Sequence, residues 1–170
     1  MSLRDRRRDD ESGRTRFQMR EKLISIGDDC WIEDESGHRA FKVNGKAMRI
    51  RDTFVLEDAR GHEVAKIQEK KLTVRDKMVI ELPQGNATVH KALVGIRDRF
   101  QIDVDGAPDL KAHGNLVDHE YEIERDGSTV ATVSKKWFRV RDSYGVEVAP
   151  GQDVALLLSV VVCIDAMSHD

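Results

Sequence analysis

Cysteine and aromatic residues are scarce in this 170-residue chain, and both shortages exclude kinds of protein. The two cysteines, Cys30 and Cys163, lie far apart and make no disulfide framework, which favours the reducing cytoplasm. Two Trp, two Tyr and five Phe are too few to build a stacking platform for single-stranded nucleic acid. We therefore expect a cytoplasmic protein with no nucleic-acid partner.

Long apolar runs are also missing. No segment approaches the ~20 apolar residues that a membrane-spanning helix needs, and the N-terminus has no apolar stretch of the kind that directs secretion. Neither a transmembrane segment nor export is therefore expected. The remaining composition, 39% hydrophobic and 35% charged, suits one globular domain with a highly charged surface.

The first residues differ in composition from the rest. Residues 1–16 contain six Arg and four acidic residues but few apolar side chains. Because such a segment cannot bury enough surface to order itself, we expect a disordered Arg-rich tail. A basic arm that touches phosphates is the functional alternative. Residues 17–170 are expected to form a single domain.

Within residues 17–170 the sequence repeats about every 24 residues. The segment 26–34 aligns with 50–58, and in four units an Arg-Asp pair marks the same position. A degenerate copy, in which His119 replaces the aspartate, brings the number of units to six. The residues at this anchor position are Asp28, Asp52, Asp76, Asp98, His119 and Asp142.

Apolar and polar residues alternate on both sides of each anchor. The residues two and four positions after it, and nine and eleven positions before it, are apolar or aromatic. Strands with one face in a core and one in water produce this pattern. Turn formers such as Ser36-Gly37 and Asp126-Gly127 separate the strands. Six hairpin-like repeats of two strands predict a mainly β fold, a closed twelve-stranded antiparallel β-barrel, because closure removes unpaired edges.

The last segment breaks this alternation, since ten of the eleven residues in 154–164 are apolar. A strand is an alternative assignment for this segment, because Val and Ile slightly disfavour a helix. A helix, however, satisfies the hydrogen bonds of its own backbone groups. We predict an apolar α-helix over 153–166, with Asp153 as its N-cap, through the centre of the barrel. The most buried residues are expected to be Leu156, Leu157, Val160, Val161 and Ile164.

Four segments carry a family resemblance: 51–54, 114–121, 135–138 and 155–165. Together with the Arg-Asp pairs, they resemble the LURP-one-related family over residues 17–167. That family is grouped with Tubby C-terminal domains and phospholipid scramblases, so the resemblance implies a barrel around a central hydrophobic helix. Tubby domains bind phosphoinositides and scramblases act at membranes, while a plant member of the family is linked to pathogen defence.

Basic residues beside aromatic residues form the main candidate site. Lys70 and Lys136 both precede an anchor by six residues, and Trp137 and Phe138 follow directly after Lys136. Because Trp137 and Phe138 are adjacent in a predicted strand, one must point away from the core unless a bulge intervenes. Cations gathered on one rim would bind anionic phospholipid headgroups, whereas a solvated rim with acids interspersed is the structural alternative. The candidate headgroup-binding residues are Lys70, Lys71, Lys135, Lys136 and Trp137.

The Arg-Asp pairs have two interpretations. Arg residues at strand starts could form a ring for phosphate oxygens. Recurrence in nearly every unit instead favours a structural role, in which Asp accepts backbone N–H bonds at a turn. The pairs are Arg51-Asp52, Arg75-Asp76, Arg97-Asp98 and Arg141-Asp142.

Sequence motifs for catalysis and metal binding are missing. There is no Cys-x-x-Cys, His-Glu-x-x-His, nucleophile elbow or glycine-rich phosphate loop, so we expect neither an enzyme nor a metal or cofactor site. Three hypotheses remain. The chain is a peripheral membrane protein that binds anionic phospholipid, a protein-interaction or scaffold domain without lipid, or an enzyme or carrier. The last is disfavoured because the helix should fill the barrel.

Overall fold

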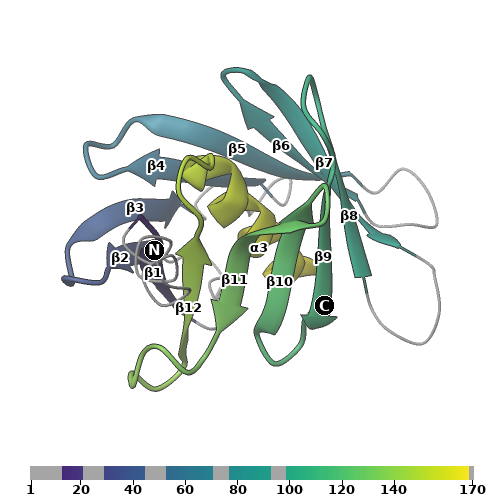
Figure 1. Cartoon of the computed structure of the whole chain (residues 1–170). Coiled ribbons are helices and arrows are strands. Elements are labelled where there is room, and N and C mark those ends of the chain that lie inside the picture. The colour runs from purple at the N-terminus through teal and green to yellow at the C-terminus, as the bar shows by residue number, and fades with distance from the viewer. Residues whose placement is uncertain (1–12, 21–28, 45–52, 71–76, 93–98, 169–170) are drawn as a thin grey trace.

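The computed structural model describes residues 13–20, 29–44, 53–70, 77–92 and 99–168. Twelve antiparallel strands follow one another around a closed barrel, and β1 completes it by pairing with both β2 and β12 (Figure 1). The predicted twelve-stranded barrel is therefore confirmed. The strands are β1 (Thr15–Arg20), β2 (Cys30–Asp34), β3 (Arg39–Asn44), β4 (Thr53–Asp58), β5 (Glu63–Lys70), β6 (Lys77–Leu82), β7 (Gly85–Ala92), β8 (Arg99–Val104), β9 (Leu110–Asn115), β10 (Glu120–Arg125), β11 (Ser128–Ser134) and β12 (Ser143–Val148).

The period-2 alternation places one face of each strand in the core. In β10, for example, Tyr121 and Ile123 are buried, while Glu120 and Glu122 are exposed. Among the residues at predicted inward positions, Cys30 and Phe41 are half-buried and one residue is exposed. Pro108 is exposed in the connection before β9, because a residue without an N–H group cannot donate to the strand pairing.

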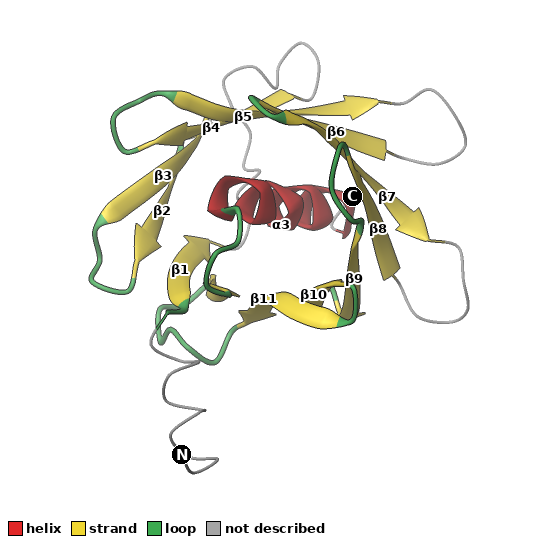
Figure 2. Ribbon diagram, turned by 45° about the horizontal axis from the view of Figure 1, so that its top comes forward, coloured by secondary structure: helices red, strands yellow, loops and turns green. Residues whose placement is uncertain are grey.

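The C-terminal helix α3 (Val154–Ser168) runs inside the ring of strands (Figure 2). Every residue from Leu156 to Asp165 is buried, including the five that the sequence marked as most buried. The predicted N-cap is confirmed, since the Leu156 N–H donates to Asp153 Oδ1 at 3.1 Å. The helix extends two residues beyond the predicted end at residue 166. Ser159, its polar residue within the apolar run, donates its hydroxyl to the Ala155 carbonyl at 2.7 Å.

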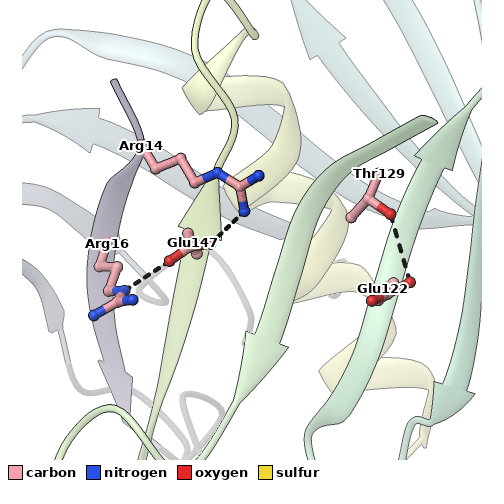
Figure 3. Close-up of polar contacts among 5 residues, drawn as sticks. All are labelled: Arg14, Arg16, Glu122, Thr129 and Glu147. Atoms are coloured by element: carbon pink, nitrogen blue, oxygen red, sulfur yellow. Dashed lines mark hydrogen bonds and ion pairs between the residues drawn. The ribbon is translucent and has the colours of Figure 1, made fainter. Parts of the chain in front are cut away.

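Strand β1 begins at Thr15, two residues before the predicted start of the domain at residue 17. Glu147 on β12 explains the difference, because it binds Arg16 at 2.7 Å and Arg14 at 3.0 Å (Figure 3). Burial raises the pKa of the Glu147 carboxyl, but hydrogen bonds from Arg16 and Arg14 outweigh that effect and leave the pKa below its ordinary value. The contact secures the β1–β12 seam that closes the barrel.

Successive connections fall at opposite ends of the barrel, because neighbouring strands are antiparallel. We call one end the turn end: it holds the connections 35–38, 59–62, 83–84 and 126–127, and the start of α3. We call the other the loop end: it holds the connections 116–119 and 135–142, and the last turn of α3. Both loop-end connections lie along the lower edge of the barrel in Figure 1.

Candidate functional site

The connection between β11 and β12 displays cations around an apolar side chain. Lys135, Lys136, Arg139 and Arg141 are all exposed in this segment. Val140 stands among them with 44% of its surface exposed. This segment therefore combines positive charge with an apolar tip at the loop end.

Hydrogen bonds fix where this connection leaves the sheet. The carboxylate of Glu120 accepts hydrogen bonds from the Ser134 hydroxyl at 3.0 Å and from the Lys135 N–H at 2.9 Å. At the other end, the Ser143 hydroxyl donates to the Val140 carbonyl at 2.6 Å. The segment is thus tied at both ends, which limits the positions that its exposed cations can take.

Trp137 and Phe138 pack the β11–β12 connection against strand β12. An added Cβ on Gly145 of β12 would lie 2.9 Å from both the Trp137 and Phe138 rings, so both rings cover this glycine. The sequence predicted that one ring must point away from the core. Residues 135–142 form a loop and not a strand, and both rings lie on the outer face of β12, because Gly145 alternates with the core residues Tyr144 and Val146. The Arg16 guanidinium lies 4.9 Å from the Trp137 ring centroid, and the Lys136 ammonium lies 6.0 Å from it. Trp137 is therefore half-buried and acts as packing beneath the cations.

The connection between β9 and β10 adds a second apolar tip. Val117 is 51% exposed, whereas its neighbour Leu116 is buried. Val117 and Val140 are the large apolar residues that the described part of the chain exposes, and both lie at the loop end. The ring of His119 stacks on Tyr144 with the centroids 4.1 Å apart, which joins this connection to the start of β12.

A buried polar cluster ties both connections to α3. Asp165 near the helix end contacts His119 Nε2 at 2.6 Å and accepts a hydrogen bond from the Tyr144 hydroxyl at 2.8 Å. Burial, with the Asp165 charge as a further cause, holds the pKa of Tyr144 and of nearby Tyr121 well above the ordinary value. Tyr144 therefore stays a protonated donor, and the cluster joins the end of α3 to His119 in the first connection and to Tyr144 at the start of β12.

The anchor positions have a conformational role where the structure describes them. His119 and Asp142 have φ values of 55° and 57°, in the left-handed region that Asp, Asn and His tolerate better than most residues. The shared conformation explains why histidine can replace aspartate in the degenerate unit. The pairs at 51–52, 75–76 and 97–98 lie outside the described residues.

The predicted headgroup residues are only partly described. Lys135, Lys136 and Trp137 lie together at the loop end, with the two lysines exposed. Lys71 lies outside the described residues, as does the side chain of Lys70 at the end of β5. The headgroup prediction did not include the exposed Val117 and Val140. Each is an apolar residue beside at least one charged residue in a segment without strand alternation, which is the signal that would have found them.

A closed antiparallel barrel filled by its own apolar helix is the class of protein that these elements define. An X-ray structure of a protein from Arabidopsis thaliana shares the fold, with a TM-score of 0.64, 18% identity, and 92% of each chain covered. The LURP-one-related family model matches residues 15–165, and the chain belongs to that family. No curated protein matches the chain. None of the helices in the described residues has the length and apolar character needed to span a bilayer.

Proposed function

We propose that this LURP-one-related barrel is a non-enzymatic, cytoplasmic domain whose loop end binds anionic phospholipid headgroups at the membrane surface. One observation carries the proposal. Four exposed cations share one connection with the exposed Val140, and Val117 is exposed on another connection at the same end. Cations beside apolar tips are what a peripheral surface needs, since headgroups bind the charges and the apolar side chains enter the interfacial region.

The magnitudes suit reversible binding. Each Lys or Arg near an anionic surface contributes about 1 kcal/mol, and the attraction fades within a Debye length of about 8 Å at physiological salt. Only cations that reach the membrane together therefore contribute. The hydrogen bonds at Glu120 and Ser143 tie the two ends of the β11–β12 connection to the sheet, which keeps its four cations at the same end of the barrel.

Because the chain has a net charge of −3, only a positively charged part of its surface would bind an anionic membrane, and binding would have one orientation. At the turn end, Asp34 and Asp58 lie at the surface, where they would be repelled by anionic lipid. The protein would thus dock with its loop end towards the membrane.

The non-enzymatic part of the proposal rests on the interior. The residues of α3 fill the barrel axis, and the His119–Asp165–Tyr144 cluster is buried, with His119 at 4% and Asp165 at 6% exposure. A polar cluster that solvent barely reaches offers no substrate access. The alternative function is a protein-interaction or scaffold domain, because the same cations and valines would also fit an acidic protein surface.

The test is vesicle cosedimentation of the full chain with three compositions: phosphatidylcholine alone, phosphatidylcholine with phosphatidylserine, and phosphatidylcholine with a phosphoinositide. We expect sedimentation with both anionic vesicles at ~0.05 M salt, weaker sedimentation at ~0.15 M salt, and none with the neutral vesicle. A clear preference for phosphoinositide at equal surface charge would identify a headgroup-specific site. Failure to bind either anionic vesicle at the lower salt would contradict the lipid proposal and favour the scaffold function.

A further inference from the structure

One histidine and two glutamates meet on the outer wall of the barrel, on the neighbouring strands β9 and β10. His113 lies on β9, and Glu122 and Glu124 lie on β10. Glu122 is the direct cross-strand partner of His113, and Glu124 follows two residues later on the same face. One ligand atom from each of the three side chains lies within 4.8 Å of the others.

Contacts already orient these groups. His113 Nε2 lies 2.8 Å from Glu124 Oε1, and the Thr129 hydroxyl of β11 donates to Glu122 Oε2 at 3.5 Å (Figure 3). The side chains of His113 and Glu124 are 42% and 31% exposed, so an ion from solution can reach them. The sheet thus preorganises three donors without burying them.

The donor set points to a particular class of ion. One imidazole nitrogen and two carboxylate oxygens are ligands that zinc accepts, whereas calcium and magnesium prefer oxygen alone. Donors bound to zinc at ~2.1 Å in tetrahedral geometry lie roughly 3.4 Å apart, so rotations of two glutamate side chains would complete the arrangement. Three protein ligands would leave one coordination position open.

The surroundings define that open position. His113 and Glu124 line a hollow of about 510 Å³ that Arg99 and Lys111 also line. Arg99 is the cross-strand partner of His113, and Lys111 is the partner of Glu124. The positive charges of Arg99 and Lys111 repel a divalent cation and so reduce the affinity of the site for zinc. The same charges would attract an anion as the fourth zinc ligand.

We propose that His113, Glu122 and Glu124 form a zinc-binding site on the outer wall of the barrel. The site shares no residue with the proposed lipid-binding surface, so a test of zinc binding is independent of the lipid proposal. No sequence motif encodes it, because the glutamates reach the histidine only through the β9–β10 register.

The neighbouring strands supply a matched control. His90 on β7 lies 3.1 Å from Asp103 on β8, which repeats the histidine–carboxylate pair. Among the described residues, the triplet of potential metal ligands occurs at His113 but not at His90. His90→Ala and His113→Ala therefore each remove one histidine–carboxylate contact. Only His113→Ala also removes a proposed metal ligand.

The experiment titrates zinc chloride into the tag-free full chain by calorimetry, and follows cobalt(II) by its visible absorption as a second readout. Wild type and His90→Ala should bind one zinc per chain with equal affinity, while His113→Ala should weaken binding by more than about tenfold and abolish the cobalt bands. Glu122→Gln should also weaken binding. Circular dichroism will verify that all variants are folded. Equal zinc binding by wild type and folded His113→Ala, or no wild-type binding at millimolar zinc, would overturn the proposal.

Discussion

The two ends of the barrel use their charged residues differently. At the turn end, Asp34 accepts hydrogen bonds from the Ser36 and His38 N–H groups, both at 2.9 Å. Asp58 does the same for the N–H groups of Arg60 and His62, again at 2.9 Å. At the loop end, within the described part of the chain, neither Arg139 nor Arg141 forms an ion pair.

This contrast separates charges that build the fold from charges available to a partner. The turn-end carboxylates face their own backbone, and the two hydrogen bonds to backbone N–H, with partial burial acting against them, lower the pKa of Asp58. Arg139 and Arg141, on either side of Val140 in the sequence, are exposed. The turn end is therefore explained by folding alone, whereas the loop end has a surface that folding does not explain.

The largest expected effect comes from the helix that both ends share. Leu157→Asp would bury a carboxylate in the apolar core, which costs several kcal/mol and should abolish cooperative unfolding. Val117→Asp makes the same chemical change at the exposed loop end and should shift the free energy of unfolding by less than about 0.5 kcal/mol. Urea denaturation measures both. A cooperatively folded Leu157→Asp variant would contradict the central placement of α3.

The buried cluster should rank next. Asp165→Ala leaves the Tyr144 hydroxyl and the His119 imidazole without this acceptor in the core, and should lower the free energy of unfolding by about 3 kcal/mol. Tyr144→Phe removes a single hydroxyl and should cost about 1 kcal/mol. If urea denaturation gave equal losses for the two variants, Asp165 would not be the centre of the cluster.

The β1–β12 seam should give a pH-dependent effect. The folded-state pKa of Glu147 is below the ordinary value of 4.5, so its stabilisation is present at neutral pH and is lost as pH falls through the lower folded-state value. Glu147→Gln should therefore be roughly 1–2 kcal/mol less stable than wild type at pH ~7, with the difference shrinking in acid. Urea denaturation across this pH range will show whether the two curves converge. A constant difference would mean that the loss is one of packing, not of charge.

A small effect is expected at the turn end, where Asp153 caps helix α3. Asp153→Ala removes the cap that holds the Leu156 N–H and should cost about 1 kcal/mol, whereas Asp153→Asn keeps an acceptor oxygen and should cost less. Thermal unfolding measures the ranking. If Asp153→Ala lowered the stability as much as Asp165→Ala does, the surface cap and the buried cluster would not differ in their contribution to stability.

The parts of the fold that the sequence predicts are those that depend on local sequence patterns. Alternation and the apolar run specify the strands and helix α3, because each depends on residues close in the sequence. The same information cannot place Trp137 and Phe138 over Gly145, because that contact depends on where β11 ends and on a glycine without a side chain.

The candidate sites depend on contacts between distant residues. His119 and Asp165 are 46 residues apart and meet only after the helix enters the barrel. The His113 triplet requires the register of two strands. By contrast, Lys135 and Lys136 are neighbours in one continuous segment, so the sequence alone places their charges together, and both side chains are exposed.

The central claim is that the loop end, and not the turn end, contacts anionic lipid. Its most direct test is cosedimentation with phosphatidylserine-containing vesicles for two variants with equal charge change. Lys135→Gln/Lys136→Gln removes two exposed loop-end cations, and Arg60→Gln/Lys111→Gln removes two exposed cations elsewhere. We expect the first variant to lose roughly tenfold or more in vesicle affinity, since each cation contributes about 1 kcal/mol, while the second binds as wild type. Equal losses in both variants would contradict the claim, because they would show that net charge alone governs binding.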